Sequence, residues 1–520
     1  MRKSPASKTS TAKGQHRERQ PSSPAPAAPG GLKILFVASE CAPYAKVGGL
    51  GDVVAALPKA LRKLGHDARI VMPLYASINR EKYGIKFVKS ACVHMGGREE
   101  QWIGVFEAVL DKQVPVWFVD CQRYFGRPGI YDEPWGEYDD NAFRYALLSK
   151  AALQICKDEN FTPDVMHAHD WMTSLVPVFL KTWDRILSPL SNTASVLTIH
   201  NVGYQGKYHI SAFPYIGIGW EYYAPDIFED YGKINLLKAG LWFTDAITAV
   251  SPTYAREILE PLGGQGMAPY LNNRKADLVG ILNGCDYEHW NPETDRMIAH
   301  KYSARDVRGK AACKADLQKR FGLQQREDWP VFGIVSRFAD QKGFNLIKEA
   351  LPRALNTMVM QVAVLGTGDS STENFFHWLT AKYPGRVGSY IGFSTELSHV
   401  VEAGSDFFLM PSLYEPCGLN QMYSMKYGTL PIVRATGGLD DSVQNYNQST
   451  GEGTGFKFLA PTGQALYDTI GWTVSTWFDR PHHIAKLRES AMAQEFSWED
   501  SARKYVEVYE RAIKKRRGTT

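Results

Sequence analysis

The sequence has few cysteines for its length and no paired cysteine motif. Its seven cysteines are odd in number and widely spaced, at Cys41, Cys92, Cys121, Cys156, Cys285, Cys313 and Cys417. This pattern argues against a disulfide framework or a zinc ribbon. No apolar run approaches the roughly 18 residues that span a bilayer, and the N-terminus has no apolar signal segment. We therefore expect a cytoplasmic protein without a membrane partner.

The first thirty residues contain no Leu, Ile, Val or Phe and are rich in Ser, Pro and Ala. Because nothing in this stretch can enter a core, we predict a disordered basic tail over residues 1–30. A Ser-rich, acid-poor N-terminus is also typical of a plastid transit peptide, so a plastid location stays open as the alternative. The net charge of +4 is concentrated at the two ends of the chain. The near-neutral body argues against nucleic-acid binding.

A chain of 520 residues, 44% hydrophobic, is too long for one ordinary domain and has enough apolar residues for large cores. Order begins with a short apolar run over residues 32–40, typical of a buried strand. The Gly-rich turn "KVGGLGD" follows, and then apolar residues recur at helical spacing from Leu50 to Leu64, before Gly65. The next strand, "DARIVMP", completes a strand–helix–strand unit. Repetition of this alternation predicts a mostly parallel sheet covered by helices.

The same pattern restarts after residues 281–292, with "PVFGIVSRF" as a second opening strand. We therefore predict the α/β class, with two tandem Rossmann-like, doubly wound domains and a cleft between them where ligands bind. Ser497 is a candidate N-cap for an amphipathic terminal helix that docks on the N-terminal domain. The predicted boundaries are residues 31–284 for the N-terminal domain, 285–490 for the C-terminal domain, 491–515 for the terminal helix and 516–520 for a tail.

Several polar loops follow the predicted strands of the N-terminal domain. In "KVGGLGD", Lys46 supplies a cation, while Gly48 and Gly49 let backbone N–H groups approach an anion at a helix start. His200 follows a strand into a Gly-containing loop, where it can donate to a sugar hydroxyl. His167 and His169 resemble half of a metal site, but no third ligand accompanies them, so we predict no metal.

The C-terminal domain carries a second set of such loops. Arg337 and Lys342 follow its opening strand, and two converging cations suit a diphosphate. The sequence contains no D-x-D triplet to clamp a metal diphosphate, so cations and helix ends must supply the positive field. Glu415 precedes a predicted helix, where a carboxylate can accept hydrogen bonds from sugar hydroxyls. Further candidates are the helix start at Thr436, Gly437 and Gly438, and Phe393 as a stacking partner for a nucleobase.

Taken together, these stretches resemble the bacterial glycogen synthase and plant starch synthase family, retaining glucosyltransferases with the two-Rossmann-domain (GT-B) fold. The resemblance covers nearly the whole chain from Lys33 to about Arg511. It is carried by "KVGGLGDVV", "HAHDW", "TIHNVGYQG", "SRFADQKG" and, most specifically, "YEPCGLNQMYSMKYGTLPIVRATGGLDDSV". One departure is Val47, where many members have Thr, so any contact made by that hydroxyl is lost or replaced.

The resemblance implies roles for individual residues. Lys46, Gly48 and Gly49 are similar to the donor-diphosphate loop, and Arg337 with Lys342 to the phosphate clamp. Asp170 and His200 match residues that line the glucose site. Glu415 and Cys417 match the glucose-binding loop, in which Gly418 and Leu419 give backbone N–H groups, and Cys417 is interpreted as a small wall residue.

The resemblance further implies transfer of glucose from ADP-glucose to the non-reducing 4-hydroxyl of an α-1,4-glucan, with retention and without a metal or other cofactor. A UDP-glucose or other donor, and a glucan-binding protein that has lost catalysis, are the alternatives. The sequence does not predict an oligomeric state.

Overall fold

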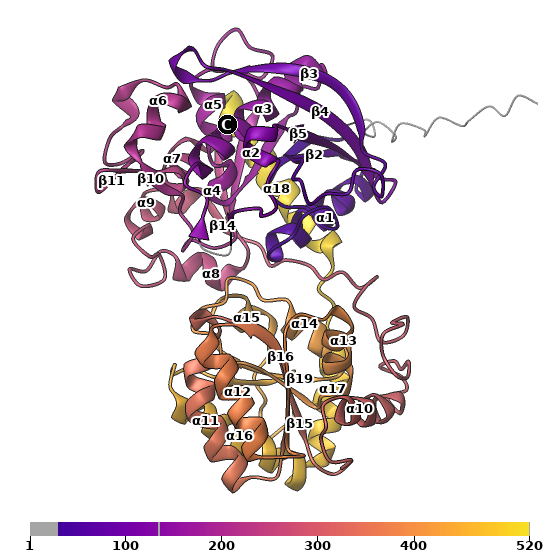
Figure 1. The fold of residues 1–520 in the computed structure, drawn as a ribbon. Coiled ribbons are helices and arrows are strands. Elements are labelled where there is room, and N and C mark those ends of the chain that lie inside the picture. The colour runs from indigo at the N-terminus through magenta and orange to yellow at the C-terminus, as the bar shows by residue number, and fades with distance from the viewer. Residues whose placement is uncertain (1–29, 134–135, 519–520) are drawn as a thin grey trace, which may run out of the picture.

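The computed structural model describes residues 30–133 and 136–518, so nearly all of the predicted N-terminal tail lies outside the described residues. Two domains lie one above the other and are joined by two crossing segments (Figure 1). Each domain has its own large apolar core. None of the helices in the described ranges is long and apolar enough to cross a membrane.

The N-terminal domain is built on a nine-stranded sheet in the order β14-β13-β9-β8-β1-β2-β5-β4-β3. All neighbouring pairs are parallel except the two made by β4, which runs antiparallel to β3 and β5. The strands are β1 (Lys33–Val37), β2 (Asp67–Pro73), β3 (Lys86–His94), β4 (Glu100–Leu110), β5 (Val114–Asp120), β8 (Val165–His169), β9 (Ala194–Ile199), β13 (Ala246–Ala249) and β14 (Leu278–Gly280). The predicted mostly parallel sheet is confirmed, and the β3–β4 hairpin is an addition that the sequence analysis does not predict.

Helices pack on this sheet through apolar faces of the kind that the sequence predicts for α1. The stripe on α1 (Gly49–Lys63) is buried at Leu50, Val53, Val54, Leu57 and Leu61, and the helix stops before Gly65, whose φ is +92°. The other helices of the domain are α2 (Gln122–Phe125), α3 (Asn141–Asp158), α4 (Asp170–Thr173), α5 (Leu175–Lys181), α6 (Phe213–Ile216), α7 (Leu236–Phe243), α8 (Pro252–Glu257) and α9 (Ala268–Asn273). Short strands lie at β6 (Asp132–Glu133), β7 (Gly136–Glu137), β10 (Lys207–His209), β11 (Glu229–Asp230) and β12 (Lys233–Asn235).

The C-terminal domain has six parallel strands in the order β17-β16-β15-β18-β19-β20, which is the doubly wound order 3-2-1-4-5-6. They are β15 (Val331–Phe338), β16 (Gln361–Gly368), β17 (Val387–Ile391), β18 (Phe407–Met410), β19 (Leu430–Arg434) and β20 (Phe456–Phe458). The helices are α10 (Gly309–Arg320), α11 (Phe344–Thr357), α12 (Ser370–Lys382), α13 (Thr395–Gly404), α14 (Asn420–Lys426), α15 (Gly437–Ser442), α16 (Gly463–Asp479) and α17 (Pro481–Met492). The predicted pair of doubly wound α/β domains is therefore confirmed.

The last helix, α18 (Trp498–Arg517), leaves the C-terminal domain and lies within the N-terminal one, as the yellow ribbon in Figure 1 shows. The Ser497 side chain accepts a hydrogen bond from the Asp500 amide and caps the helix. Tyr509 Oη lies 2.9 Å from His167 Nδ1 in the core. At the far end, Lys515 pairs with Asp277 at 2.7 Å and Arg517 with Asp164 at 2.8 Å. The helix thus includes Arg516 and Arg517, which the sequence analysis assigns to a tail.

The two segments that cross between the domains are bonded to each other. The Cys285 amide donates to the Phe496 carbonyl at 2.8 Å, and the Phe496 amide donates to Tyr287 Oη at 3.0 Å. A side chain at Gly284 would place its Cβ 2.7 Å from the Trp498 backbone. This close approach requires glycine, and it holds the start of α18 against the first crossing segment.

We predict that Tyr509→Phe lowers the free energy of unfolding by about 1–3 kcal/mol, because buried His167 loses a hydrogen-bond partner. The matched control is Glu507→Ala on the exposed face of the same helix, expected within about 0.5 kcal/mol of the parent. Thermal and denaturant unfolding measure both. Equal stability of the Tyr509→Phe variant and the parent would contradict the docking contact.

Candidate functional site

The C-terminal domain brings two predicted site residues into direct contact. Strands β15 and β18 are neighbours at the point where the strand order reverses, and the loops after them meet there. Lys342 Nζ, from the first loop, lies 2.6 Å from Glu415 Oε2, from the second. Ser412 Oγ donates to the same oxygen at 2.9 Å. Glu415 is buried, so its charge is balanced by this cation and hydroxyl, while Oε1 has no partner among the described residues.

Backbone packing holds these two loops together. The Leu413 amide donates to the Gln341 carbonyl at 2.8 Å, and the Gln341 side chain donates to the Tyr414 carbonyl at 3.1 Å. Gly343, at φ +73°, has the Pro411 carbonyl oxygen 2.0 Å from where a Cβ would stand. Any other residue at this position would push the loops apart, so the glycine is required by close approach.

Arg337, at the carboxyl end of β15, is exposed. Its side chain has no hydrogen bond or ion pair with another residue in the described part of the chain, unlike that of Lys342. A free guanidinium at the end of a parallel strand is available for a bidentate contact with a phosphate. Phe393, after β17, is 86% exposed, so its ring is open to a ligand.

Cys417 lies in the loop that also contains Glu415, and it is buried against the core of the N-terminal domain. Burial raises the pKa of its thiol to about 12, so the group is a neutral wall rather than a nucleophile. The backbone N–H groups of Gly418 and Leu419 have no acceptor among the described residues. Because α14 has only seven residues, these individual N–H groups matter more here than the helix dipole that the sequence analysis invokes.

The donors at the start of α15 are occupied within the protein. Thr436 Oγ1 and the Gly437 amide donate to Glu257 Oε1 of α8, in the other domain, at 2.9 and 3.0 Å. The Gly438 amide donates to the Glu415 carbonyl at 3.1 Å. A Cβ at Gly437 would stand 2.0 Å from that same carbonyl oxygen. In this conformation, these residues therefore hold the backbone of the Glu415 loop in place and bond the two domains to each other.

The N-terminal domain has its own reversal of strand order, between β1 and β8. Glu40, just after β1, is buried, and its Oε2 accepts hydrogen bonds from the amides of Val47 and Gly48 at 2.6 and 3.1 Å. Lys46 pairs with Asp52 at 2.7 Å. The predicted anion-binding turn thus binds a carboxylate of its own chain. Glu40 is not among the predicted site residues, although a polar residue at the end of a buried strand is a signal that marks it.

Asp170 and His200 lie together at the ends of β8 and β9. Asp170 Oδ1 accepts a hydrogen bond from the His200 amide at 2.7 Å, and the Asp170 backbone is left-handed, with φ +52°. Such a conformation is uncommon outside glycine, and strain of this kind is concentrated at functional sites. His200 Nε2 lies 3.0 Å from His169 Nδ1. Burial lowers the pKa of His200 to about 3, so the ring is neutral at physiological pH.

The burial of His169 determines which ring nitrogen carries the proton. Its Nε2 is buried and has no partner within the described part of the chain. A buried orphan N–H costs more than a buried orphan lone pair, so the His169 proton belongs on Nδ1, where it donates to His200 Nε2. The His200 proton then lies on Nδ1, which has no protein partner in the described structure. His169 therefore orients His200 as a hydrogen-bond donor, a role that the sequence analysis does not assign.

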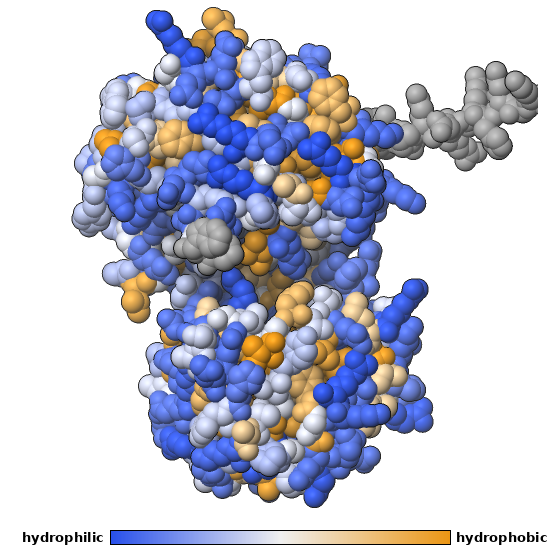
Figure 2. Space-filling model, viewed as in Figure 1, coloured by the Kyte–Doolittle hydropathy of each residue, from blue (hydrophilic) through white to orange (hydrophobic). Residues whose placement is uncertain are grey.

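The crevices of the two domains face each other. Ser251 Oγ donates to the Pro416 carbonyl at 2.6 Å, and Thr253 Oγ1 donates to Asp441 at 2.7 Å. Cys417 and Met422 join the apolar core of the N-terminal domain. The surface is hollowed between the two domains in the space-filling view (Figure 2). The loops that carry Glu415, Lys342, Asp170 and His200 thus open onto one interdomain region.

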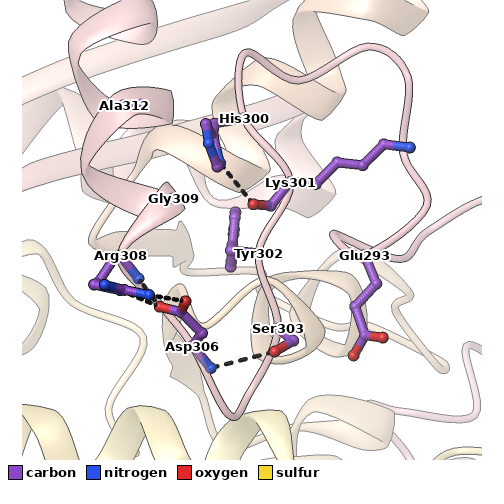
Figure 3. Close-up of a pocket in the computed structure, with 9 residues that line it drawn as sticks. All are labelled: Glu293, His300, Lys301, Tyr302, Ser303, Asp306, Arg308, Gly309 and Ala312. Atoms are coloured by element: carbon purple, nitrogen blue, oxygen red, sulfur yellow. Dashed lines mark hydrogen bonds and ion pairs between the residues drawn. The ribbon is translucent and has the colours of Figure 1, made fainter.

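A separate pocket of about 680 Å³ lies beside the start of α10, as the sticks in Figure 3 show. Arg308 in this pocket is paired with Asp306 at 2.6 Å, and His300 Nδ1 lies 2.7 Å from the Lys301 carbonyl oxygen. None of the predicted site residues lines it. The pocket belongs to the segment that enters the C-terminal domain, away from the strand ends.

Asp170 should make stability depend on pH. Burial raises the pKa of its carboxyl to about 7 from 3.8, against the lowering effect of the two amide hydrogen bonds. The folded state therefore holds a proton that the unfolded state releases, and the free energy of unfolding falls as pH rises from about 4 to 7. Asp170→Asn should remove this contribution, so the variant gains stability relative to the parent across that window. A variant-to-parent difference that is flat with pH would contradict the assignment.

The two family models that match this chain divide it as the fold does. One is described as the starch synthase catalytic domain and matches residues 33–273; the other is described as glycosyl transferases group 1 and matches residues 316–486. A glycogen synthase of Geobacter sulfurreducens is 49% identical, covering 94% of this chain and 97% of the relative. One from Treponema denticola is 46% identical, covering 93% and 99%.

Solved structures agree with these sequence relatives. The catalytic domain of starch synthase IV from Arabidopsis thaliana, bound to ADP and acarbose, is 32% identical with a TM-score of 0.85, covering 93% of this chain and 99% of that one. A sucrose-phosphate synthase from Thermosynechococcus elongatus, 16% identical with a TM-score of 0.56, shares the fold. On this evidence the chain belongs to the glycogen synthase and starch synthase family of glucosyltransferases.

Proposed function

We propose that the enzyme transfers glucose from ADP-glucose to the 4-hydroxyl at the non-reducing end of an α-1,4-glucan, with retention at the anomeric carbon. The observation that carries the proposal is the meeting of Lys342 and Glu415 at the strand reversal, in the loops after β15 and β18. Arg337 lies at the end of β15, and its guanidinium has no partner among the described residues. The ADP and acarbose in the related starch synthase structure support both the nucleotide and the glucan.

The cationic groups of the C-terminal domain suit the leaving diphosphate. Arg337 has a free guanidinium fork, and the amides of Gly418 and Leu419 are unbonded within the described structure. Lys342 keeps one positive charge next to this region while it holds Glu415 in place. We assign Arg337 and Lys342 to the diphosphate. Lys46, from the opposite domain, reaches it when its weak, half-exposed pair with Asp52 is exchanged for phosphate.

The neutral and anionic groups suit the sugar. The free oxygen of Glu415 can accept a hydrogen bond from a glucose hydroxyl, and His200 Nδ1–H can donate one. Asp170 accepts a hydrogen bond from the backbone amide of His200 and so positions that residue. Asp170 also lines the wall of the sugar site. Donors and acceptors on both sides of the ring would fix its orientation relative to the diphosphate.

In the proposed step, the bond between the anomeric carbon and the phosphate oxygen breaks, and a bond to the acceptor O4 forms on the same face. The acceptor hydroxyl proton passes to the departing phosphate oxygen, so no external base is consumed. Fixed donors aimed at developing charge are worth about 3–4 kcal/mol each in such a step. We further propose that side chains and amides stabilise this charge without a metal ion or other cofactor, since the sequence lacks a D-x-D clamp.

A donor assay tests the function directly. Purified enzyme is incubated with glycogen and either ADP-glucose or UDP-glucose, with and without EDTA, and nucleotide release is measured. We expect release from ADP-glucose to be the faster and to be insensitive to EDTA. Faster release from UDP-glucose would overturn the donor assignment, and glucan binding without turnover on either donor would overturn the enzyme.

Arg337→Ala should lower kcat/KM by at least ~10-fold while leaving the free energy of unfolding within about 0.5 kcal/mol, because this exposed side chain makes no hydrogen bond or ion pair within the described part of the chain. Lys342→Ala is a less specific test, because it also leaves the buried carboxylate of Glu415 without its cation. The matched control is Arg326→Ala, which removes an exposed arginine before the amino end of β15. Parent-like kinetics in the Arg337 variant would remove this residue from the diphosphate site.

A further inference from the structure

The β3–β4 hairpin forms the edge of the N-terminal sheet (Figure 1). Three side chains that can ligate a metal lie on its outward face. Cys92 and His94 are two residues apart on β3, and Glu100 on β4 lies directly opposite His94 in the register. Their ligand atoms all lie within 4.8 Å of one another, and His94 Nδ1 is 3.7 Å from Glu100 Oε1. No other set of three such groups occurs among the described residues.

Strand alternation explains why these side chains share a face. Ala91, Val93 and Met95 point into the core, so Cys92 and His94 point away from it. Glu100 is diagonal to Cys92, within reach of a side chain on the same face. The hairpin backbone therefore fixes the relative positions of all three groups, and only their rotamers need to adjust.

A simple surface ion pair between His94 and Glu100 is the competing interpretation. Such a pair, with side chains 66% and 56% exposed, contributes little to stability and gives no role to the thiol. Cys92, however, is the one cysteine of the seven that is not buried. A solvent-accessible thiol next to an imidazole and a carboxylate is a donor set that a metal ion can use without opening the fold.

We propose that Cys92, His94 and Glu100 bind a zinc ion, with water as the fourth ligand. One sulfur, one nitrogen and one oxygen donor suit Zn²⁺ better than Mg²⁺ or Ca²⁺, which prefer oxygen alone. Two ligand atoms that each lie about 2.0–2.3 Å from one tetrahedral zinc ion are separated by a distance close to the 3.7 Å between His94 Nδ1 and Glu100 Oε1. The thiol proton leaves for solvent as the sulfur–zinc bond forms, so the site binds more tightly as pH rises.

The site would join the edge strand to its neighbour, close to the hairpin turn. That turn packs on the domain at Gly96, where an added Cβ would stand 1.9 Å from the Pro214 carbonyl oxygen. In the sheet, β3 and β4 lie beyond β5 and β2, away from the strands that carry Glu40, Asp170 and His200. Zinc here would stabilise the hairpin and leave the sugar-transfer site untouched.

Alkylation of the full-length native protein tests the proposal, because Cys92 is the accessible thiol. The metal-free protein is treated with iodoacetamide at increasing Zn²⁺, and modification of the Cys92 peptide is measured by mass spectrometry. We expect Zn²⁺ to protect Cys92 in the parent. His94→Gln and Glu100→Gln should each require at least ~10-fold more Zn²⁺ for equal protection. The control Glu107→Gln, exposed on the same strand, should behave as the parent does.

Cobalt gives an independent measurement. Titration with Co²⁺ should produce a thiolate-to-cobalt absorption band in the parent and in Glu107→Gln, and none in Cys92→Ser. The proposal fails if Cys92 is alkylated equally fast with and without Zn²⁺. It also fails if Zn²⁺ protects Cys92 in His94→Gln and in Glu100→Gln as well as it does in the parent, which would indicate binding by the thiol alone. It also fails if the cobalt band persists in Cys92→Ser.

Discussion

The ion pair between Lys342 and Glu415 is the contact on which the geometry of the site depends. The parallel order of the C-terminal sheet sends the chain in opposite directions after β15 and β18, so the two loops diverge around a crevice. A buried carboxylate there is costly unless a cation faces it. Lys342 meets this need at one oxygen of the carboxylate, and the other oxygen has no partner among the described residues.

The two domains have different electrostatic characters. On the C-terminal side a guanidinium and two amides that have no partner within the described ranges favour negative charge. On the N-terminal side burial keeps His169 and His200 neutral and raises the pKa of Asp170. A substrate that is charged at one end and neutral at the other fits such a division. Neutral groups around a sugar also avoid the cost of desolvating charges when the domains approach each other.

The sequence predicts most of the fold because the parallel strands are short buried runs, followed by loops rich in glycine and charge. The β3–β4 hairpin escapes prediction since its outer face carries exposed Phe87 and Trp102, which blur the alternation expected of a half-buried strand. The importance of His169 depends on its contact with His200 at the end of the neighbouring strand, which no local pattern contains. Glu40 bonds to Val47 within the loop between β1 and α1, and its place after a buried strand is a local sign of its role. Likewise, Thr436 and Gly437 are predictable as donors, whereas their acceptor, Glu257, comes from the other domain.

The path of α18 has a consequence for biosynthesis. This helix contributes Tyr505 and Tyr509 to the core of the N-terminal domain, beside β8 and β9. A ribosome makes the strands of that domain first and the helix last, with the whole C-terminal domain between them. The N-terminal domain is therefore made first, but its core is complete only after α18 has been made. Until then, the groove that α18 fills is an exposed apolar surface that a nascent-chain chaperone would need to cover.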